Sequence, residues 1–159
     1  MADEKVPMTM EGKRALEDEL KRLLYVERPS VVKAIEHARS LGDLSENADY
    51  SAAKERQGFI EGRIQEINSK LSRAQVIDVR AIKADKILFG ATVALEEQES
   101  GKASKYKIVG VDESDIKLNK ISVNSPLARA LIGKKIGDEV VFNAPKGIVR
   151  YDVVDLCYE

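Results

Sequence analysis

The apolar positions of residues 10–74 recur with a helical period. In the second part of this segment their spacing alternates between four and three residues, which is the heptad pattern of a coiled-coil seam. The members of this seam are Ala53, Gln57, Ile60, Ile64, Ile67, Leu71 and Ala74. The first part offers a similar seam made of Leu16, Leu20, Leu24, Arg28, Val31, Ile35 and Ala38. The pattern predicts two long helices that pack along these seams.

A short polar segment, residues 42–47, separates the two predicted helices, so they should form an antiparallel hairpin. The first helix is expected from about residue 9 to about residue 41. At the α-helical rise it would be ~45–50 Å long, which is too long for a compact bundle. Pro29 lies inside this helix and removes one backbone donor, so we expect a bend there rather than an end.

After residue 78 the pattern changes to short β-branched runs that predict strands: KILFGATVAL, KYKIVGV, DEVVFN and GIVRYDVVDL. One short helix lies among them, because Ser125 suits its cap, Pro126 its first position and Gly133 the left-handed residue past its end. We therefore expect an α+β protein. Its parts would be a helical hairpin over residues 1–78, a linker near residues 77–84 and an antiparallel sheet domain with one short helix over residues 79–159.

Composition and charge limit the class of protein. The net charge is −1, so no global basic field exists to drive non-specific nucleic-acid binding. The single cysteine, Cys157, cannot form an internal disulfide, which fits a reducing cytoplasm. No segment approaches the ~20 apolar residues of a membrane span. These features predict a soluble cytoplasmic protein without a membrane partner.

The connection between the two helices is rich in acids. Asp43, Glu46 and Asp49 lie within seven residues, and no Lys or Arg occurs between Arg39 and Lys54. The ordinary interpretation is helix capping, because Asp-x-x-Glu resembles a capping box and the helix dipole favours acids at this end. Capping needs only one acid, however, and a hairpin tip is well placed to deliver carboxylates to a partner. Spacing alone favours capping, and the surplus of acids keeps the delivery hypothesis open.

The residue types at the turn also limit which metal could bind. An EF-hand calcium loop fails, because its required Gly and Glu positions hold Ala48 and Lys54. Magnesium accepts one or two carboxylates together with waters and phosphates, so a partner would supply the remaining ligands. The single histidine, His37, excludes a histidine-cluster site, and Cys157 suits a core thiol better than a nucleophile.

Two long motifs carry a resemblance to a known family. GDLSENADYSAAKERQGFIEGRI and NSPLARALIGKKIGDEV, with AQVIDV at the end of the second helix, resemble the bacterial Gre transcript-cleavage factors. The resemblance covers essentially the whole chain. It is closer to the GreA type than to GreB, which usually has a polar or basic residue where Leu44 stands. Ala128, where the family often has Gly, is a small departure.

The resemblance implies a fold and a partner. It implies an N-terminal antiparallel coiled coil and a C-terminal FKBP-like domain, similar to FK506-binding prolyl isomerases. The C-terminal domain would dock at the rim of the secondary channel of bacterial RNA polymerase, and the coiled coil would enter the channel. The tip acids would hold a second Mg²⁺ jointly with the polymerase, whose active site then cuts the backtracked nascent RNA. The protein would be a cofactor of that cleavage rather than an enzyme, with no small-molecule substrate and no tightly bound metal of its own.

Matching the family motif assigns roles to the tip residues. The catalytic and metal-holding acids fall on Asp43 and Glu46. The basic patch that faces the 3′ segment of the nascent RNA falls on Arg39 and Lys54, and Asp49 is left to the first turn of the second helix. Three further residues support the tip by capping, packing or orienting a ligand: Ser45, Asn47 and Tyr50.

Three other functions compete with this one. An inhibitor of the same fold could enter the same channel without promoting cleavage, but GDLSEN argues against it. A coiled-coil scaffold would need its tip charges only for stability. A prolyl isomerase or chaperone would need an aromatic-lined pocket, whereas the C-terminal region has no Trp and only Phe89, Tyr106, Phe142, Tyr151 and Tyr158.

Overall fold

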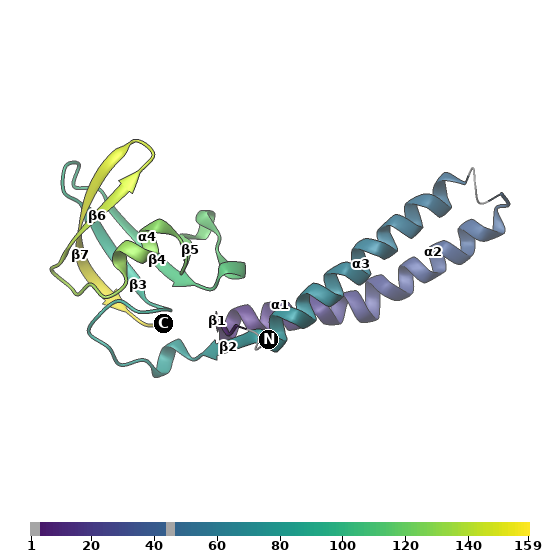
Figure 1. Ribbon diagram of the computed structural model, residues 1–159, viewed down its shortest axis with the longest axis horizontal. Coiled ribbons are helices and arrows are strands. Elements are labelled where there is room, and N and C mark those ends of the chain that lie inside the picture. Colours follow the sequence, from purple (N-terminus) through teal and green to yellow (C-terminus); the bar gives the residue numbers. More distant parts are fainter. Residues whose placement is uncertain (1–3, 44–46) are drawn as a thin grey trace. The chain divides into compact units, whose positions relative to one another are not determined.

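The computed structural model describes residues 4–43 and 47–159 of the chain. These residues form two compact units (Figure 1). One unit contains Lys13–Ala74, and the other contains Lys5–Gly12 together with Gln75–Glu159. The sequence predicts a domain boundary between residues 78 and 79. That these two domains fold independently stays a prediction.

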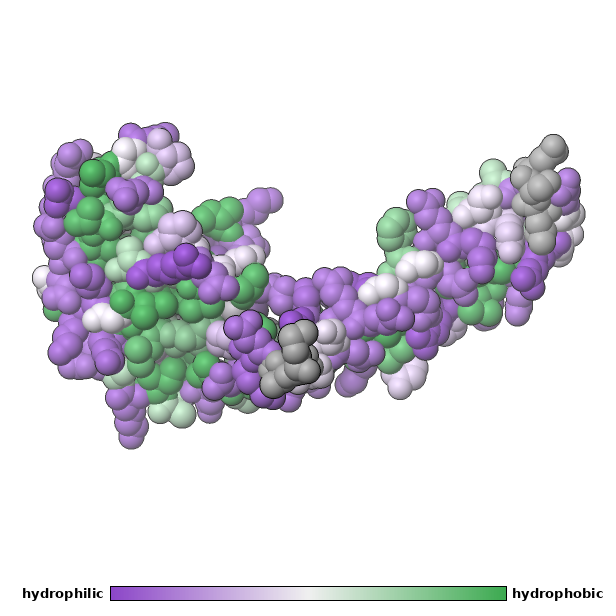
Figure 2. Space-filling view, viewed as in Figure 1, coloured by the Kyte–Doolittle hydropathy of each residue, from purple (hydrophilic) through white to green (hydrophobic). Residues whose placement is uncertain are grey.

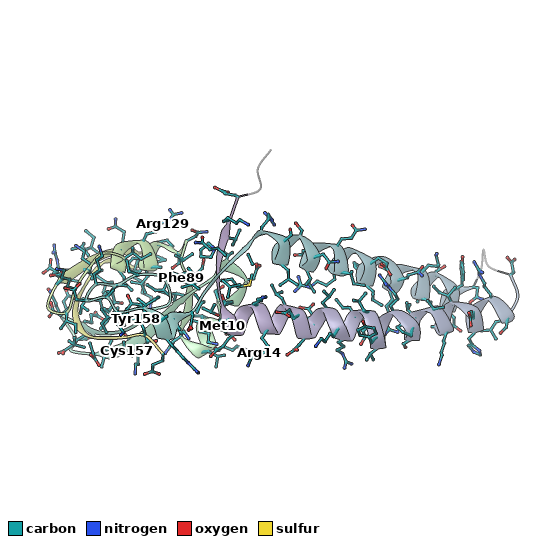
Figure 3. All side chains as sticks on the ribbon, turned by 90° about the horizontal axis from the view of Figure 1, so that it is seen from below. Met10, Arg14, Phe89, Arg129, Cys157 and Tyr158 are labelled. Atoms are coloured by element: carbon teal, nitrogen blue, oxygen red, sulfur yellow. The ribbon has the colours of Figure 1, made fainter. Side chains whose placement is uncertain are left out.

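The first unit is a helical hairpin, and its seams are the predicted ones. Its helical segments are α1 (Met10–Arg22), η1 (Leu23–Glu27), α2 (Arg28–Ser40) and α3 (Ala48–Arg73), with α2 and α3 side by side (Figures 1 and 3). The seam prediction is confirmed, because the following members are buried: Leu16, Val31, Ile35, Ala38, Ala53, Ile60, Ile64 and Ile67. Among the residues described, no helix is both long enough and apolar enough to cross a membrane.

The first helical arm continues through Pro29, as expected. The irregularity lies just before the proline, where η1 is a π-helical segment and the N–H of Arg28 donates to the carbonyl oxygen of Leu23. In a regular α-helix the proline ring would clash with the carbonyl of the preceding turn. A π turn is wider, so it relieves this crowding without ending the helix.

Two bidentate ion pairs fix the register of the antiparallel helices. Arg28 donates from Nε and Nη2 to Oε1 and Oε2 of Glu61, at 2.8 Å each. Arg63 donates from Nε and Nη2 to Oε2 and Oε1 of Glu19, at 2.6 and 2.7 Å. These hydrogen bonds hold the pKa values of Glu61 and Glu19 below the usual 4.5. Sliding one helix by a turn would break both pairs, so they select a single alignment.

The second unit is built on a five-stranded sheet in the order β5-β4-β3-β7-β6. Its strands are β3 (Thr92–Glu97), β4 (Ala103–Val109), β5 (Lys120–Ser122), β6 (Glu139–Ala144) and β7 (Gly147–Cys157). The α+β prediction is confirmed, and β3–β4, β3–β7 and β6–β7 are antiparallel. The prediction of a wholly antiparallel sheet is wrong for one pair, because β4 and β5 are parallel. The chain between β4 and β5 crosses over through η3 (Val111–Glu113) and η4 (Ile116–Leu118). A short apolar run predicts a strand but not whether it pairs in a parallel or antiparallel direction.

The core of this unit lies between the sheet and α4 (Pro126–Leu131). The predicted ends of α4 are confirmed: Oγ of Ser125 accepts from the N–H of Ala128 at 3.2 Å, and Gly133 has a φ of 91°. The side chain of Ala128 is fully buried, so a small residue is required there. The core consists of Ile87, Ala91, Val93, Leu95, Ile108, Ile121, Ala128, Leu131, Val140 and Val153.

A second, two-stranded sheet was not predicted. It joins β1 (Val6–Thr9), which leads into α1, to β2 (Ala74–Ile77), which follows α3. The two ends of the hairpin are therefore held together by main-chain pairing. A short 3₁₀ turn, η2 (Val79–Ala81), follows β2.

Candidate functional site at the hairpin tip

α2 ends in a turn that leads the chain away from the helix. Leu41 keeps helical dihedral angles, and its N–H donates to the carbonyl oxygen of Ala38 at 3.1 Å. Gly42 follows with a φ of 117°, a region that favours glycine over residues with a side chain. Gly42 therefore fixes the point at which the acidic segment leaves α2.

Asn47 connects the two helix ends at the tip. Its Oδ1 accepts from the N–H of Tyr50 at 3.1 Å, so Asn47 is the N-cap of α3. Its Nδ2 donates to the carbonyl oxygen of Ala38 at 2.6 Å, which gives this end carbonyl of α2 a second donor beside the N–H of Leu41. One side chain thus binds the last turn of one helix and the first turn of the next.

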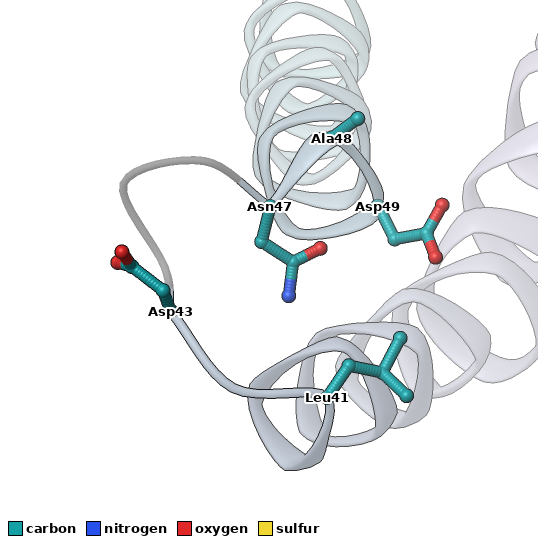
Figure 4. A pocket seen from close by; sticks show the side chains of 5 residues that line it. All are labelled: Leu41, Asp43, Asn47, Ala48 and Asp49. Carbon is teal, nitrogen blue, oxygen red and sulfur yellow. The ribbon is translucent and has the colours of Figure 1, made fainter.

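The described acids of the tip lie on different sides of Asn47. Figure 4 shows the carboxylate of Asp43 on one side of Asn47 and that of Asp49 on the other. Both side chains are exposed, and both line an open depression of about 320 Å³ together with Leu41, Asn47 and Ala48. Asp49 lies in the first turn of α3, where the helix dipole favours an acid. Asp43 precedes the helix and is exposed.

Two of the predicted tip residues, Ser45 and Glu46, lie outside the described residues. The roles predicted for them, tip support for Ser45 and metal binding for Glu46, stay predictions.

The predicted basic residues lie on both helices near the tip. Arg39 is exposed in the last turn of α2, where a cation is favoured by the helix dipole. Lys54 is exposed on α3 and donates from Nζ to Oε1 of Gln57 at 3.1 Å. Tyr50 is half-buried, and its N–H is the donor that Asn47 caps. Both cations are therefore accessible to a polyanion.

The donor set of the tip fits a hard cation only in part. Within residues 4–43 and 47–159, no three His, Cys, Asp or Glu side chains lie close enough together to hold a metal ion. The exposed carboxylate of Asp43 is nevertheless the oxygen donor that Mg²⁺ prefers, and Mg²⁺ keeps several waters or phosphate oxygens in its coordination shell. The residues at the tip can supply part of a magnesium site whose other ligands come from a second molecule.

The two reactive side chains outside the tip have ordinary surroundings. His37 is exposed on α2. Cys157 ends β7 (Figure 3), and its Sγ lies 3.3 Å from Oε1 of Glu159. Burial raises the pKa of the Cys157 thiol, and the neighbouring carboxylate acts in the same direction. The protonated thiol is a poor nucleophile, in keeping with a packing role.

Comparison with known families covers both parts of the chain. Residues 6–76 match the family model described as "Transcription elongation factor, N-terminal". Residues 82–158 match the one described as "Transcription elongation factor, GreA/GreB, C-term". The helical hairpin and the mixed-sheet unit are thus the two parts of a transcription elongation factor. The chain belongs to the GreA/GreB family, which confirms the resemblance seen in the sequence motifs.

Two relatives that are more than half identical to this chain agree with this assignment. The transcription elongation factor GreA of Pelobacter propionicus is 56% identical over 154 residues, which span 97% of this chain and 98% of the relative. That of Syntrophotalea carbinolica is 57% identical over 153 residues, spanning 96% and 97%. Among solved structures, GreA factor homolog 1 (Gfh1) of Thermus thermophilus has 27% identity and a TM-score of 0.44, with 96% of this chain and 98% of that chain covered. The GreA/GreB factor of Nitrosomonas europaea has 21% identity and a TM-score of 0.44, with 98% and 100% covered.

One feature of the tip could not be found from the sequence. The capping preference of Asn predicts the hydrogen bond from the N–H of Tyr50, but no sequence pattern indicates the bond from Asn47 to Ala38. That bond depends on the two helix ends being brought together, which is a property of the folded hairpin.

Proposed function

We propose that this protein enters the secondary channel of bacterial RNA polymerase and stimulates the polymerase's Mg²⁺-dependent endonucleolytic cleavage of backtracked nascent RNA. The observation that carries the proposal is the exposed carboxylate of Asp43 at the tip of a long hairpin, in a chain of the GreA/GreB family. α3 alone, with its 26 residues, spans about 39 Å at the α-helical rise. Such a hairpin can carry a carboxylate deep into a partner. The protein is a cofactor of the cleavage, and the polymerase is the enzyme.

Some tip residues would bind the metal, and others would position the segment that carries them. Asp43, together with Glu46, supplies carboxylate oxygens to an Mg²⁺ that the polymerase also holds. A magnesium ion held in this way activates water and stabilises charge during phosphodiester cleavage. Gly42 and Asn47 hold the two ends of the acidic segment, because one fixes its exit from α2 and the other its entry into α3.

The cations of the tip face a different part of the substrate. Arg39 and Lys54 are exposed close to the acids and suit the phosphates of the extruded 3′ segment of the nascent RNA. They would contribute affinity for that RNA without sequence specificity, since they contact the backbone.

The C-terminal unit supplies the docking surface. Ile116 and Leu118 in η4 are 73% and 65% exposed, and Val111 in η3 is 45% exposed. Figure 2 shows apolar side chains on the visible face of this unit, whereas the visible face of the hairpin is mainly polar. Contiguous exposed apolar patches mark protein interaction sites, so these three side chains are the candidate contacts. Binding to the rim of the polymerase secondary channel would place the protein in the cytoplasm.

The alternatives receive less support. Three of the five aromatic residues of the C-terminal region, Tyr106, Tyr151 and Tyr158, pack against the hydrophobic core, so they contribute to packing rather than to an isomerase pocket. Burial raises the pKa values of Tyr151 and Tyr158, in agreement with this position. Tyr158 also donates to the carbonyl oxygen of Lys86 at 2.6 Å and accepts from the N–H of Leu88 at 2.9 Å.

The test is a cleavage assay on reconstituted, backtracked transcription complexes in the presence of Mg²⁺. We expect the wild-type protein to accelerate release of a short 3′ fragment. Asp43→Ala and Glu46→Ala should abolish this stimulation and leave binding to polymerase largely intact. Asp49→Ala is the matched control, because it removes an acid of the same tip that lies on the other side of Asn47. Absence of stimulation by the wild type, or equal loss with all three variants, contradicts the proposal.

A further inference from the structure

Away from the tip, one carboxylate holds the beginning of the first helical arm. Oε2 of Glu113 accepts from the N–H of Thr9 and from the N–H of Gly110, at 3.0 Å each, and Oε1 accepts from the hydroxyl of Thr9. Oγ1 of Thr9 in turn accepts from the N–H of Gly12 at 3.0 Å, so Thr9 is the N-cap of α1. We call Thr9, Gly12, Gly110 and Glu113 the Glu113 clasp. All four residues belong to the C-terminal unit.

The clasp leaves no room for a Cβ atom at Gly110 or Gly12 while Glu113 keeps its position. A Cβ atom at Gly110 would lie 2.7 Å from Oε2 of Glu113 and 2.8 Å from the carbonyl oxygen of Pro7. A Cβ atom at Gly12 would overlap Cδ of Glu113. Gly12 lies within α1, where glycine is a poorer helix former than alanine, so its helix propensity does not explain its presence. The close approach of the Glu113 carboxylate explains why this position has no side chain.

The clasp joins two parts of the chain that lie far apart in sequence. Thr9 and Glu113 are separated by 104 residues, and Thr9 is only 3% exposed. Glu113 ends η3, and Gly110 immediately precedes η3. The first turn of α1 is therefore hydrogen-bonded to the crossover between β4 and β5, within the C-terminal unit, before the helix continues as the first arm of the hairpin.

We propose that Glu113 is a positioning residue for stimulated RNA cleavage: it anchors the first turn of α1 to the C-terminal unit, so that docking of this unit is coupled to the hairpin through an ordered helix start. The proposal rests on the proposed function of the tip. Glu113 touches neither RNA nor metal in this role, and it acts through Thr9. A loose helix start would leave binding of the C-terminal unit in place and lower the fraction of bound molecules whose tip is correctly placed.

A first experiment tests the clasp without any activity measurement. Amide hydrogen exchange is measured in the full-length protein for Thr9, Gly12 and Gly110. Glu113→Ala should raise the exchange rates of the Thr9 and Gly110 amides by about ten-fold or more, because these donors lose their acceptor. The Gly12 amide donates to Oγ1 of Thr9, which is only held indirectly by Glu113, so its exchange rate should rise less. Glu113→Gln keeps one carbonyl oxygen as an acceptor and should have a smaller effect. Asp115→Ala is the matched control, since Oδ1 of Asp115 accepts from the N–H of Lys117 within its own turn and should leave the three amides unchanged.

The glycines provide a second, independent test of the same contact. Gly12→Ala alone should destabilise the protein, because its methyl group displaces the Glu113 carboxylate. In the Glu113→Ala background the same substitution should cost less or stabilise, since the obstructing atoms are gone and alanine is the better helix former. Gly62→Ala is the control, because nothing lies within 4 Å of a Cβ atom at Gly62. Equal effects of Gly12→Ala in both backgrounds would overturn the clasp.

The cleavage assay then separates positioning from docking. At saturating concentration Glu113→Ala should lower the maximal stimulated rate by about ten-fold, as expected for a misplaced reactive group, while the half-saturating concentration stays close to that of the wild type. Glu113→Gln should restore part of the rate. An unchanged maximal rate, or a change confined to the half-saturating concentration, overturns the positioning role. If the wild type itself fails to stimulate cleavage, the proposed function fails and the positioning role fails with it, whereas hydrogen exchange still decides whether the clasp exists.

Discussion

The side-chain amide of Asn47 donates to the main-chain carbonyl of Ala38 at 2.6 Å and so joins the end of α2 to the start of α3. The same side chain accepts from the N–H of Tyr50 at 3.1 Å. Asp43 lies on the segment between these two helix ends. The bridge between the two helix ends is therefore made by a neutral side chain.

The first prediction concerns Asn47. Asn47→Ala removes the cap of α3 and the bridge to Ala38, and should lower the free energy of unfolding of the hairpin by about 1–2 kcal/mol. Asn47→Ser should retain most of the capping part and lose only the bridge. The measurement is urea unfolding followed by helical circular dichroism. If Asn47→Ser is as unstable as Asn47→Ala, the cap contributes nothing and the bridge carries the whole effect.

The second prediction concerns the cations of the tip. Arg39→Ala should weaken cleavage in complexes with a long extruded RNA and affect complexes with a short one little, because the longer RNA offers more phosphates. For Lys54→Ala we expect the same selectivity. Each substitution should also reduce the slope of the logarithm of RNA affinity against the logarithm of salt concentration by about one unit. Lys33→Ala, an exposed cation elsewhere on α2, is the control. Equal cleavage of long and short substrates by all variants contradicts an RNA-facing patch.

The third prediction concerns the metal. Asp43→Asn keeps the shape of the side chain but removes its charge, so it should weaken Mg²⁺ binding in the joint site. Stimulated cleavage should then need about ten-fold more Mg²⁺, the equivalent of ~1.4 kcal/mol in affinity. Titrating Mg²⁺ in the cleavage assay with wild type and variant measures the shift. A lower rate that excess Mg²⁺ does not restore at all would show that Asp43 acts on something other than the metal.

The hairpin could be predicted because its signal is local. The seam residues Ile60, Ile64 and Ile67 follow one another at heptad spacing, and each is buried in the structure. The ends of α4 were predictable for the same reason, since Ser125 and Gly133 have the conformations that their residue types favour. Two strand pairings were not predictable: the parallel pairing of β4 with β5 and the pairing of β1 with β2. The sequence of a strand does not indicate which distant segment it pairs with.

The position of the candidate site could be predicted, but the hydrogen bonds that hold its helices could not. Two seams joined by an acidic turn place Asp43 at a tip, and the structure shows it there, exposed. The bonds from Asn47 to Ala38 and from Thr9 to Glu113 arise only when distant segments meet. The functional roles of Asp43, Glu46 and Arg39 remain predictions that the assays above address.

The fourth prediction concerns two glycines on the exposed surface of α3. Gly58 and Gly62 lie in the helix interior, and a Cβ atom at either position would have nothing within 4 Å. Alanine is the better helix former at such sites by about 0.5–1 kcal/mol. Gly58→Ala and Gly62→Ala should each raise the midpoint of hairpin unfolding in urea. A decrease at either position would mean that glycine serves the complex with polymerase rather than the free hairpin.

The last prediction concerns the pH dependence of the hairpin. The hydrogen bonds from Arg63 lower the pKa of Glu19 from 4.5, and the pKa values of Glu27, Glu61 and Glu66 are lowered in the same direction by their own partners. A carboxyl whose pKa is lower in the folded than in the unfolded state stabilises the fold above the unfolded value, and loses that contribution as the pH falls through the folded value.

The free energy of unfolding of the hairpin should therefore fall as the pH drops below 4.5, the unshifted carboxyl pKa. Glu19→Gln removes one titrating partner, so the stability difference between wild type and variant should be largest near neutral pH and shrink in acid. Urea unfolding at several pH values measures this difference. Glu17→Gln is the matched control, because Glu17 lies on the same helix and its ion pair with Lys13 is longer, at 3.9 Å, and stays within α1. A difference for Glu19→Gln that is constant across the pH range would show that the pair contributes through packing and neutral hydrogen bonding rather than through its charge.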